Sequence, residues 1–82
     1  MAEKVGEVFT YFAKIGVAGV KITDGSLSVG DKIKIEGATT NIEQTVDSMQ
    51  IDKNSVQSAE KGQSVGIKVK DRVRPNDVVY KV

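Results

Sequence analysis

The sequence contains no histidine and no cysteine. Without cysteine the chain can form no disulfide and has no cysteine nucleophile, and without histidine it cannot carry a Ser-His-Asp triad of its own. The two absences together also exclude zinc sites built from Cys and His, and covalent haem attachment. Any chemistry near neutral pH would therefore need a carboxylate or a lysine whose pKa is shifted.

Long apolar runs are absent as well. No stretch approaches the roughly 18 apolar residues that argue for a membrane-spanning helix, and the start of the sequence lacks the apolar segment of a secretory signal peptide. We therefore expect a cytoplasmic protein with no membrane partner.

The chain also lacks a surplus of charge. Twelve basic and 11 acidic residues give a net charge of +1, so the strong overall basic signal of many nucleic-acid-binding proteins is missing. Any binding to nucleic acid would have to come from a local patch.

Leucine occurs once, whereas valine occurs 13 times and isoleucine seven times. These β-branched residues lose rotamer freedom in helices and pack well on pleated sheets. The length of 82 residues suits one small core, and no repeat or low-complexity stretch divides the chain. We therefore expect residues 1–82 to form a single all-β domain.

Alternation of apolar and polar residues predicts about six short strands separated by turn signals, the pattern of a small sandwich or closed barrel. The expected runs are residues 5–13, 15–22, 32–36, 45–52, 63–70 and 78–82. A β-bulge between Val46 and Met49 would turn both inward. Residues 58–62 could hold one helical turn or a bend at Gly62.

The inward positions of these runs predict the core, with Ile67 at its centre. The predicted buried residues are Val8, Ala18, Val20, Ile22, Ile33, Ile35, Met49, Ile51, Val65, Ile67 and Val69.

Four short motifs follow one another along the chain. They are Leu27–Asp31 (LSVGD), Val46–Ile51 (VDSMQI), Ala59–Ile67 (AEKGQSVGI) and Asp77–Val79 (DVV). In this order and spacing they resemble the second domain of translational GTPases such as elongation factor Tu, from about Lys4 to Val82. The resemblance implies a small closed six-stranded antiparallel β-barrel that contacts tRNA ends, ribosomal RNA or a neighbouring GTPase domain.

The chain also resembles the C-terminal accessory domain of collagenase-like peptidase-family proteins, a family whose members are linked to RNA hydroxylation.

We expect the chain to have no GTPase activity of its own. The nearest phosphate-loop candidate, Gly25–Lys32, has Asp31 where the phosphate-binding lysine belongs, and a carboxylate there would repel phosphates. We therefore expect no nucleotide binding.

The candidates for RNA binding are basic. Lys68, Lys70, Arg72 and Arg74 recur at period 2, so a strand that ran straight through Arg74 would place their cations on one face. Lys32 and Lys34 could extend this patch. The alternative is that these lysines only solvate the barrel surface and suppress aggregation.

Tyr11 is a candidate for stacking on bases. Strict alternation would put Phe9 and Tyr11 on one face and Phe12 on the other. An exposed aromatic pair could stack on bases, or it could cover a gap in the core.

The aspartates mostly fall at predicted turns, where they can accept backbone N–H bonds. We expect no catalytic residue, no metal and no cofactor. Two functions remain. The first is a module that binds tRNA, ribosomal RNA or the ribosome. The second is a protein-interaction module that docks on a separately encoded enzyme or GTPase, for which an exposed apolar patch would be the mark.

Overall fold

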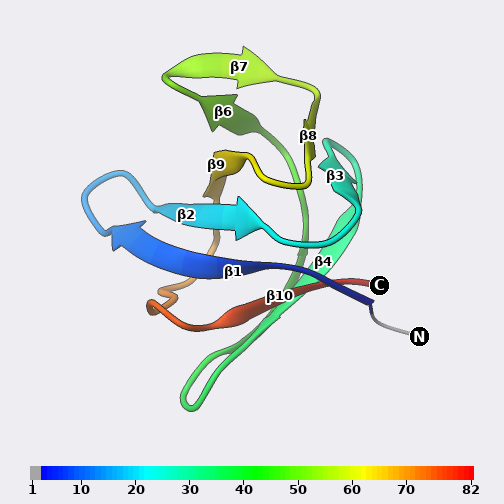
Figure 1. Ribbon diagram of the computed structural model, residues 1–82. Coiled ribbons are helices and arrows are strands. Elements are labelled where there is room, and N and C mark those ends of the chain that lie inside the picture. The colour runs from blue at the N-terminus through cyan, green and yellow to red at the C-terminus, as the bar shows by residue number, and fades with distance from the viewer. Residues whose placement is uncertain (1–2) are drawn as a thin grey trace.

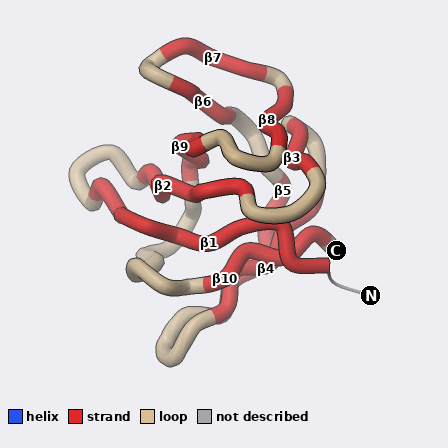
Figure 2. Tube along the Cα trace, viewed as in Figure 1, coloured by secondary structure: helices blue, strands red, loops and turns tan. Residues whose placement is uncertain are grey.

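The computed structural model describes residues 3–82. In that range the chain forms β-strands and no helix (Figures 1 and 2). The all-β prediction is confirmed. There are ten strands rather than about six, because short strands also form in polar segments that indicated loops or turns. The strands are β1 (Glu3–Phe12), β2 (Val17–Ile22), β3 (Ser26–Ser28), β4 (Lys32–Glu36), β5 (Asn41–Thr45), β6 (Met49–Ile51), β7 (Asn54–Val56), β8 (Ser58–Glu60), β9 (Ser64–Lys68) and β10 (Val78–Lys81).

Eight of the strands form one curled antiparallel sheet in the order β5-β4-β10-β1-β2-β9-β6-β7, and β3 pairs with β8 in a second small sheet. The first and last strands are direct neighbours, since Glu3 of β1 lies opposite Lys81 of β10. The start of β1 and the end of β10 accordingly lie side by side (Figure 1). Within residues 3–82 the two edge strands, β5 and β7, do not pair with each other, so the curled sheet is an open ladder.

A side-chain amide spans part of this opening. The Gln44 Nε2 atom on β5 donates to the carbonyl oxygen of Lys68 at 2.8 Å, and the Gln44 Oε1 atom accepts from the backbone N–H of Lys70 at 2.9 Å. Both bonds reach the end of β9 from the far edge of the sheet. Gln44 therefore joins two segments that no backbone ladder connects.

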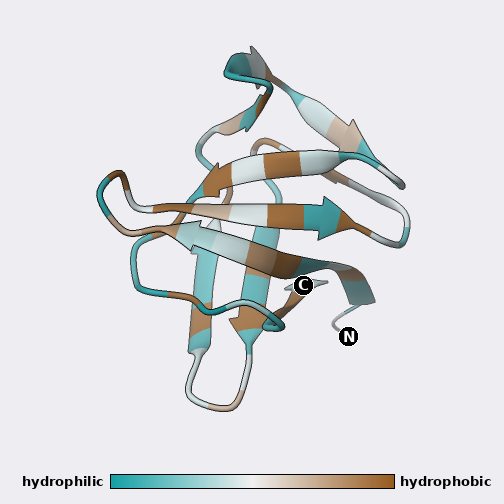
Figure 3. Cartoon of the chain, turned by 60° about the vertical axis from the view of Figure 1, so that its left-hand side comes forward, coloured by the Kyte–Doolittle hydropathy of each residue, from teal (hydrophilic) through white to brown (hydrophobic). Residues whose placement is uncertain are grey.

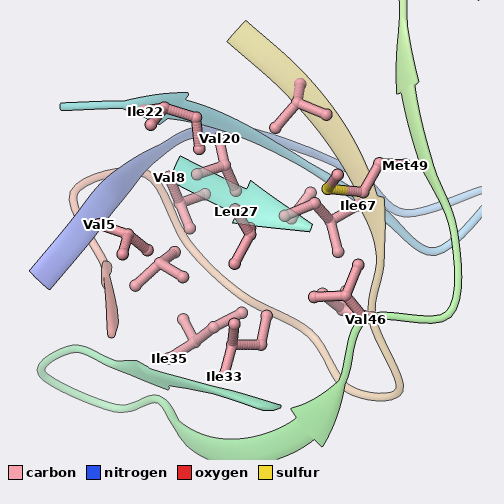
Figure 4. Packing of buried hydrophobic residues seen from close by; sticks show 14 of the residues in the cluster. Val5, Val8, Val20, Ile22, Leu27, Ile33, Ile35, Val46, Met49 and Ile67 are labelled. Atoms are coloured by element: carbon pink, nitrogen blue, oxygen red, sulfur yellow. The ribbon is translucent and has the colours of Figure 1, made fainter. Parts of the chain in front are cut away.

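The core lies inside the curl, where the inward side chains of the strands meet (Figure 4). Hydrophobic and hydrophilic residues alternate along the strands, as Figure 3 shows, so each strand gives one face to this core. The buried apolar residues are Val5, Val8, Ala18, Val20, Ile22, Leu27, Ile33, Ile35, Val46, Met49, Ala59, Val65, Ile67, Val69, Val73 and Val79.

The predicted core is confirmed at every position but one. Ile51 is only half-buried, because it pairs with Asn54 beside the turn of the outermost hairpin. Val46 and Met49 are both buried, as expected, but no bulge brings them inward. The chain leaves β5 after Thr45 and starts a new strand at Met49.

Three tight turns share one hydrogen-bonding pattern. In each, the side chain of the fourth residue accepts from the backbone N–H of the first, and the backbone N–H of the fourth donates to the carbonyl of the first. The turns are Ser28–Asp31, Glu60–Gln63 and Arg74–Asp77. The third residue of each has the positive φ that a type II turn requires: Gly30 (97°), Gly62 (92°) and Asn76 (79°). Gly62 thus makes a bend, and two of the aspartates serve the turns.

Ile67 provides the test of this core. Its side chain is fully buried, so Ile67→Ala should lower the free energy of unfolding by about 2–5 kcal/mol. Urea denaturation measures the change. Ile15 is the matched control because it is 63% exposed, and Ile15→Ala should change stability by no more than about 0.5 kcal/mol. Equal losses in the two variants would contradict the assigned inward face.

Candidate functional site

A register shift decides where the aromatic side chains of β1 point. Val8 pairs with Val20 and Thr10 pairs with Gly19, so Phe9 is an extra residue in the ladder between β1 and β2. Phe9 is 53% exposed, whereas Tyr11 packs against the core. The prediction that Phe9 and Tyr11 share one face is wrong, because alternation holds only in a regular strand.

Phe9 and Phe12 instead lie together on the outer surface. With Ile15 from the β1–β2 turn, they line a shallow groove of about 460 Å³ that extends over β2, β9 and the β6–β7 hairpin. We call this surface the aromatic groove. Phe12 and Ile15 are 51% and 63% exposed. Three large apolar side chains therefore stand in solvent on one face.

Two glycines form the floor of the aromatic groove. Gly19 and Gly66 are direct partners in the β2–β9 ladder. A Cβ atom on Gly19 would lie 2.9 Å from the ring carbon Cζ of Phe9, and a Cβ atom on Gly66 would lie 3.2 Å from Cγ1 of Val17. Both contacts are tighter than ordinary van der Waals contact. The two glycines therefore let the Phe9 ring and the Val17 side chain lie directly against the backbone of the sheet, and glycines at outward strand positions are the sequence signal for this close approach.

The basic residues near the C-terminus do not form a straight row. β9 ends at Lys68, and the buried side chains of Val69 and Val73 hold the following segment against the core. Lys70, Arg72 and Arg74 are exposed along that segment.

These four cations have no ion-pair partner within residues 3–82. There the ion pairs involve other lysines, namely Lys4, Lys32, Lys34 and Lys81. We call Lys68, Lys70, Arg72 and Arg74 the unpaired basic segment. Its charge is free to meet an anionic partner.

Lys32 and Lys34 lie on β4 and are already paired. The Lys32 Nζ atom is 3.6 Å from Glu43 Oε2, and the Lys34 Nζ atom is 2.8 Å from Glu36 Oε1. The hydrogen bond to Glu36, together with the charge of that carboxylate, raises the pKa of Lys34. These two lysines add less available positive charge than the unpaired basic segment.

Residues 3–82 contain no group of three or more His, Cys, Asp or Glu residues placed to hold a metal ion. Over the same range, no helix is long and apolar enough to cross a membrane.

The family model for elongation factor Tu domain 2 matches residues 16–80. The chain belongs to this family. As a domain 2 protein it is also similar to parts of longer proteins. It is 42% identical over 78 residues to a collagenase from Porphyromonas gingivalis, covering 94% of this chain and 22% of that protein. An uncharacterized protease from Methanocaldococcus jannaschii is 40% identical over 78 residues, covering 94% and 19%.

This domain 2 chain therefore spans about a fifth of the length of the curated relatives it matches. Among solved structures it is similar to the C-terminal domain of a protein assigned to the U32 peptidases in Geobacillus thermoleovorans. The TM-score is 0.90 at 25% identity, covering 98% of this chain and 92% of that one. A selenomethionine variant of that domain gives a TM-score of 0.88 at 25% identity, covering 94% and 96%. This domain 2 chain thus shares its fold with the C-terminal domain of that Geobacillus protein.

Tyr11 and Phe12 are neighbours with opposite expected roles. Tyr11→Ala removes a ring that packs on the core and should lower the free energy of unfolding by about 1–3 kcal/mol. Phe12→Ala removes a ring that is half exposed and should cost less than about 1 kcal/mol. Chemical denaturation of both variants is the measurement. A larger loss for Phe12→Ala would contradict the assignment of Tyr11 to the core.

Proposed function

We propose that this domain 2 protein is a non-catalytic accessory module that docks on the catalytic region of a U32 peptidase-type protein. The aromatic groove is the docking surface. One observation carries the proposal: Phe9, Phe12 and Ile15 are each more than half exposed and line the same groove. A cluster of large apolar side chains in solvent is typical of interaction sites.

The choice of partner rests on the lengths of the relatives. The chain corresponds to 22% and 19% of the two proteins described above, so about four-fifths of each lies outside the matched region. In those relatives the matched domain is part of the same chain as this remainder, so the remainder is the first partner to consider. The proposal holds whether the module and its partner belong to one chain or to two.

A non-catalytic role agrees with how the carboxylates are used. Asp31 and Asp77 accept backbone N–H bonds within their own turns, and Lys81 Nζ lies 3.4 Å from Asp31 Oδ2. Neither carboxylate is left to act as an acid or base. The aromatic groove is lined mainly by apolar atoms and glycine backbone, which suits binding better than catalysis.

Binding to a U32-type catalytic region tests the proposal. The partner is the U32-type protein encoded in the same genome, with its own domain 2 region removed if it has one, and isothermal titration calorimetry measures the affinity. The double variant Phe12→Ser and Ile15→Ser should weaken binding by about tenfold or more, because buried aromatic anchors dominate most interfaces.

Val82→Ser is the matched control, because Val82 is 48% exposed and lies outside the aromatic groove. This variant should bind like the parent. Binding that the double variant leaves unchanged, or that Val82→Ser weakens equally, would rule out the groove as the docking surface. Absence of any binding would overturn the choice of partner.

RNA binding is a second candidate, favoured by the unpaired basic segment. The segment has four exposed cations within seven residues, and none of the four forms an ion pair with another residue of the range 3–82. Such a local cluster would attract phosphates despite the net charge of +1. The partner would be tRNA or ribosomal RNA, and the module would then work in the cytoplasm.

Fluorescence anisotropy against bulk tRNA and ribosomal subunits tests this candidate. Affinity should fall steeply between about 50 and 200 mM salt, and it should fall further when Lys68, Lys70 and Arg72 are changed to Gln. The control replaces Lys32 and Lys34 by Gln, whose cations already have partners and whose loss should matter less. Salt-independent binding, or equal losses in both variants, would exclude the segment as an RNA site.

A further inference from the structure

We propose that the aromatic groove selects an extended, acidic segment of its partner that inserts one bulky apolar side chain beside Phe9, Phe12 and Ile15. This inference rests on the proposed docking function and adds the chemistry of the docked segment. Three properties of the groove lead to it: its floor, its two unlike walls and the charges on its rim.

The floor of the aromatic groove carries no side chain of its own, because Gly19 and Gly66 lie there. These glycines face each other across the β2–β9 ladder, so the Phe9 ring and the Val17 side chain lie directly against the backbone, and the hollow lies beside them. Its volume of about 460 Å³ lies at the lower end of the roughly 300–1,000 Å³ of pockets that hold a small ligand. This volume suits one large inserted side chain.

The size of the hollow also selects the shape of the docked segment. An α-helix with its side chains is about 10–12 Å across, too broad to enter a shallow hollow of this volume. A second depression adjoins the aromatic groove and shares Ile15, Val17 and Gly66 with it, and this depression reaches Lys68. The two adjoining hollows together reach from the β6–β7 hairpin to Lys68, and such a continuous course fits an extended chain.

The walls of the aromatic groove differ. Phe9, Phe12 and Ile15 form an apolar wall, whereas Gln50 and Lys53 from the β6–β7 hairpin lie on the polar side. An inserted apolar side chain would contact the first wall, and the flanking residues of the segment would meet the second. The aliphatic Ile15 and Val17 beside the rings favour a protein side chain over a stacked base.

The charges on the rim favour acidic flanking residues. Lys53 lies on the groove and Lys68 lies on the adjoining depression, whereas Asp52 is the only acidic residue lining either hollow within the described chain. Asp52 and Lys53 occupy a two-residue turn in which both have positive φ (50° and 68°). This turn holds the Lys53 backbone at the rim. The net charge of the residues that line the two hollows is positive, so acidic residues that flank the inserted side chain give electrostatic complementarity.

Labelled peptides test the inference by fluorescence anisotropy at low salt. The probe is a short acidic peptide with one central phenylalanine. One control replaces its acidic residues with lysine, and a second replaces the phenylalanine with alanine. The probe should bind at least about tenfold more tightly than either control. A tenfold difference in affinity corresponds to about 1.4 kcal/mol.

Two variants locate the site. Gly66→Val fills the floor and should abolish binding, with a thermal melt to check that the variant folds. Lys53→Glu combined with Lys68→Glu should reverse the preference toward the lysine peptide, a result that loss of folding cannot produce. The matched control combines Lys61→Glu with Arg74→Glu, since neither residue lines the groove, and it should keep the acidic preference.

Several outcomes would overturn the inference. They are equal binding of the acidic and basic peptides, a preference that the Lys53 and Lys68 reversal does not change, and no binding of any peptide. If an oligoadenylate bound and Gly66→Val abolished that binding, the groove would be a nucleic-acid site instead. If the U32-type catalytic region binds through the aromatic groove but the peptides show no acidic preference, only this inference fails and the docking function stands.

Discussion

The register shift between Val8 and Thr10 is the feature on which the rest of the surface depends. A bulge lets one strand bend and twist more strongly than its partner, and β1 carries a second shift between Lys4 and Gly6, toward β10. With these two irregularities β1 follows the curl of the sheet. The same shift sends Phe9 outward and leaves Tyr11 on the core.

Alternation in the sequence predicted much of the fold because most strands are regular. β4 and β9 bury every second residue, as in Ile33 and Ile35. Asp and Gly at the turns were informative for a physical reason, since a positive φ and a short side-chain acceptor are what a type II turn needs. The family resemblance rests on these turns together with the buried positions between them.

The same reasoning failed where the ladder is irregular. Period-2 spacing placed Phe9 with Tyr11, because a bulge has no obvious mark in the sequence. The predicted strand covered residues 63–70, and only its straight continuation through Arg74 would have placed the four cations on one face. The strand β9 ends at Lys68 instead, and the buried Val73 holds the following segment against the core. The aromatic groove was missed for a related reason. The glycines that form its floor lie at outward positions of β2 and β9, and there an absent side chain is the signal.

The pairing of Glu3 with Lys81 bears on how this curled sheet can be connected to other domains. The first and last strands of the domain are neighbours in the sheet. The domain could therefore be joined to a second domain, or inserted into one of its loops, without rearrangement of the fold. The core of the domain is therefore compatible with a covalent connection to a second domain at this one place.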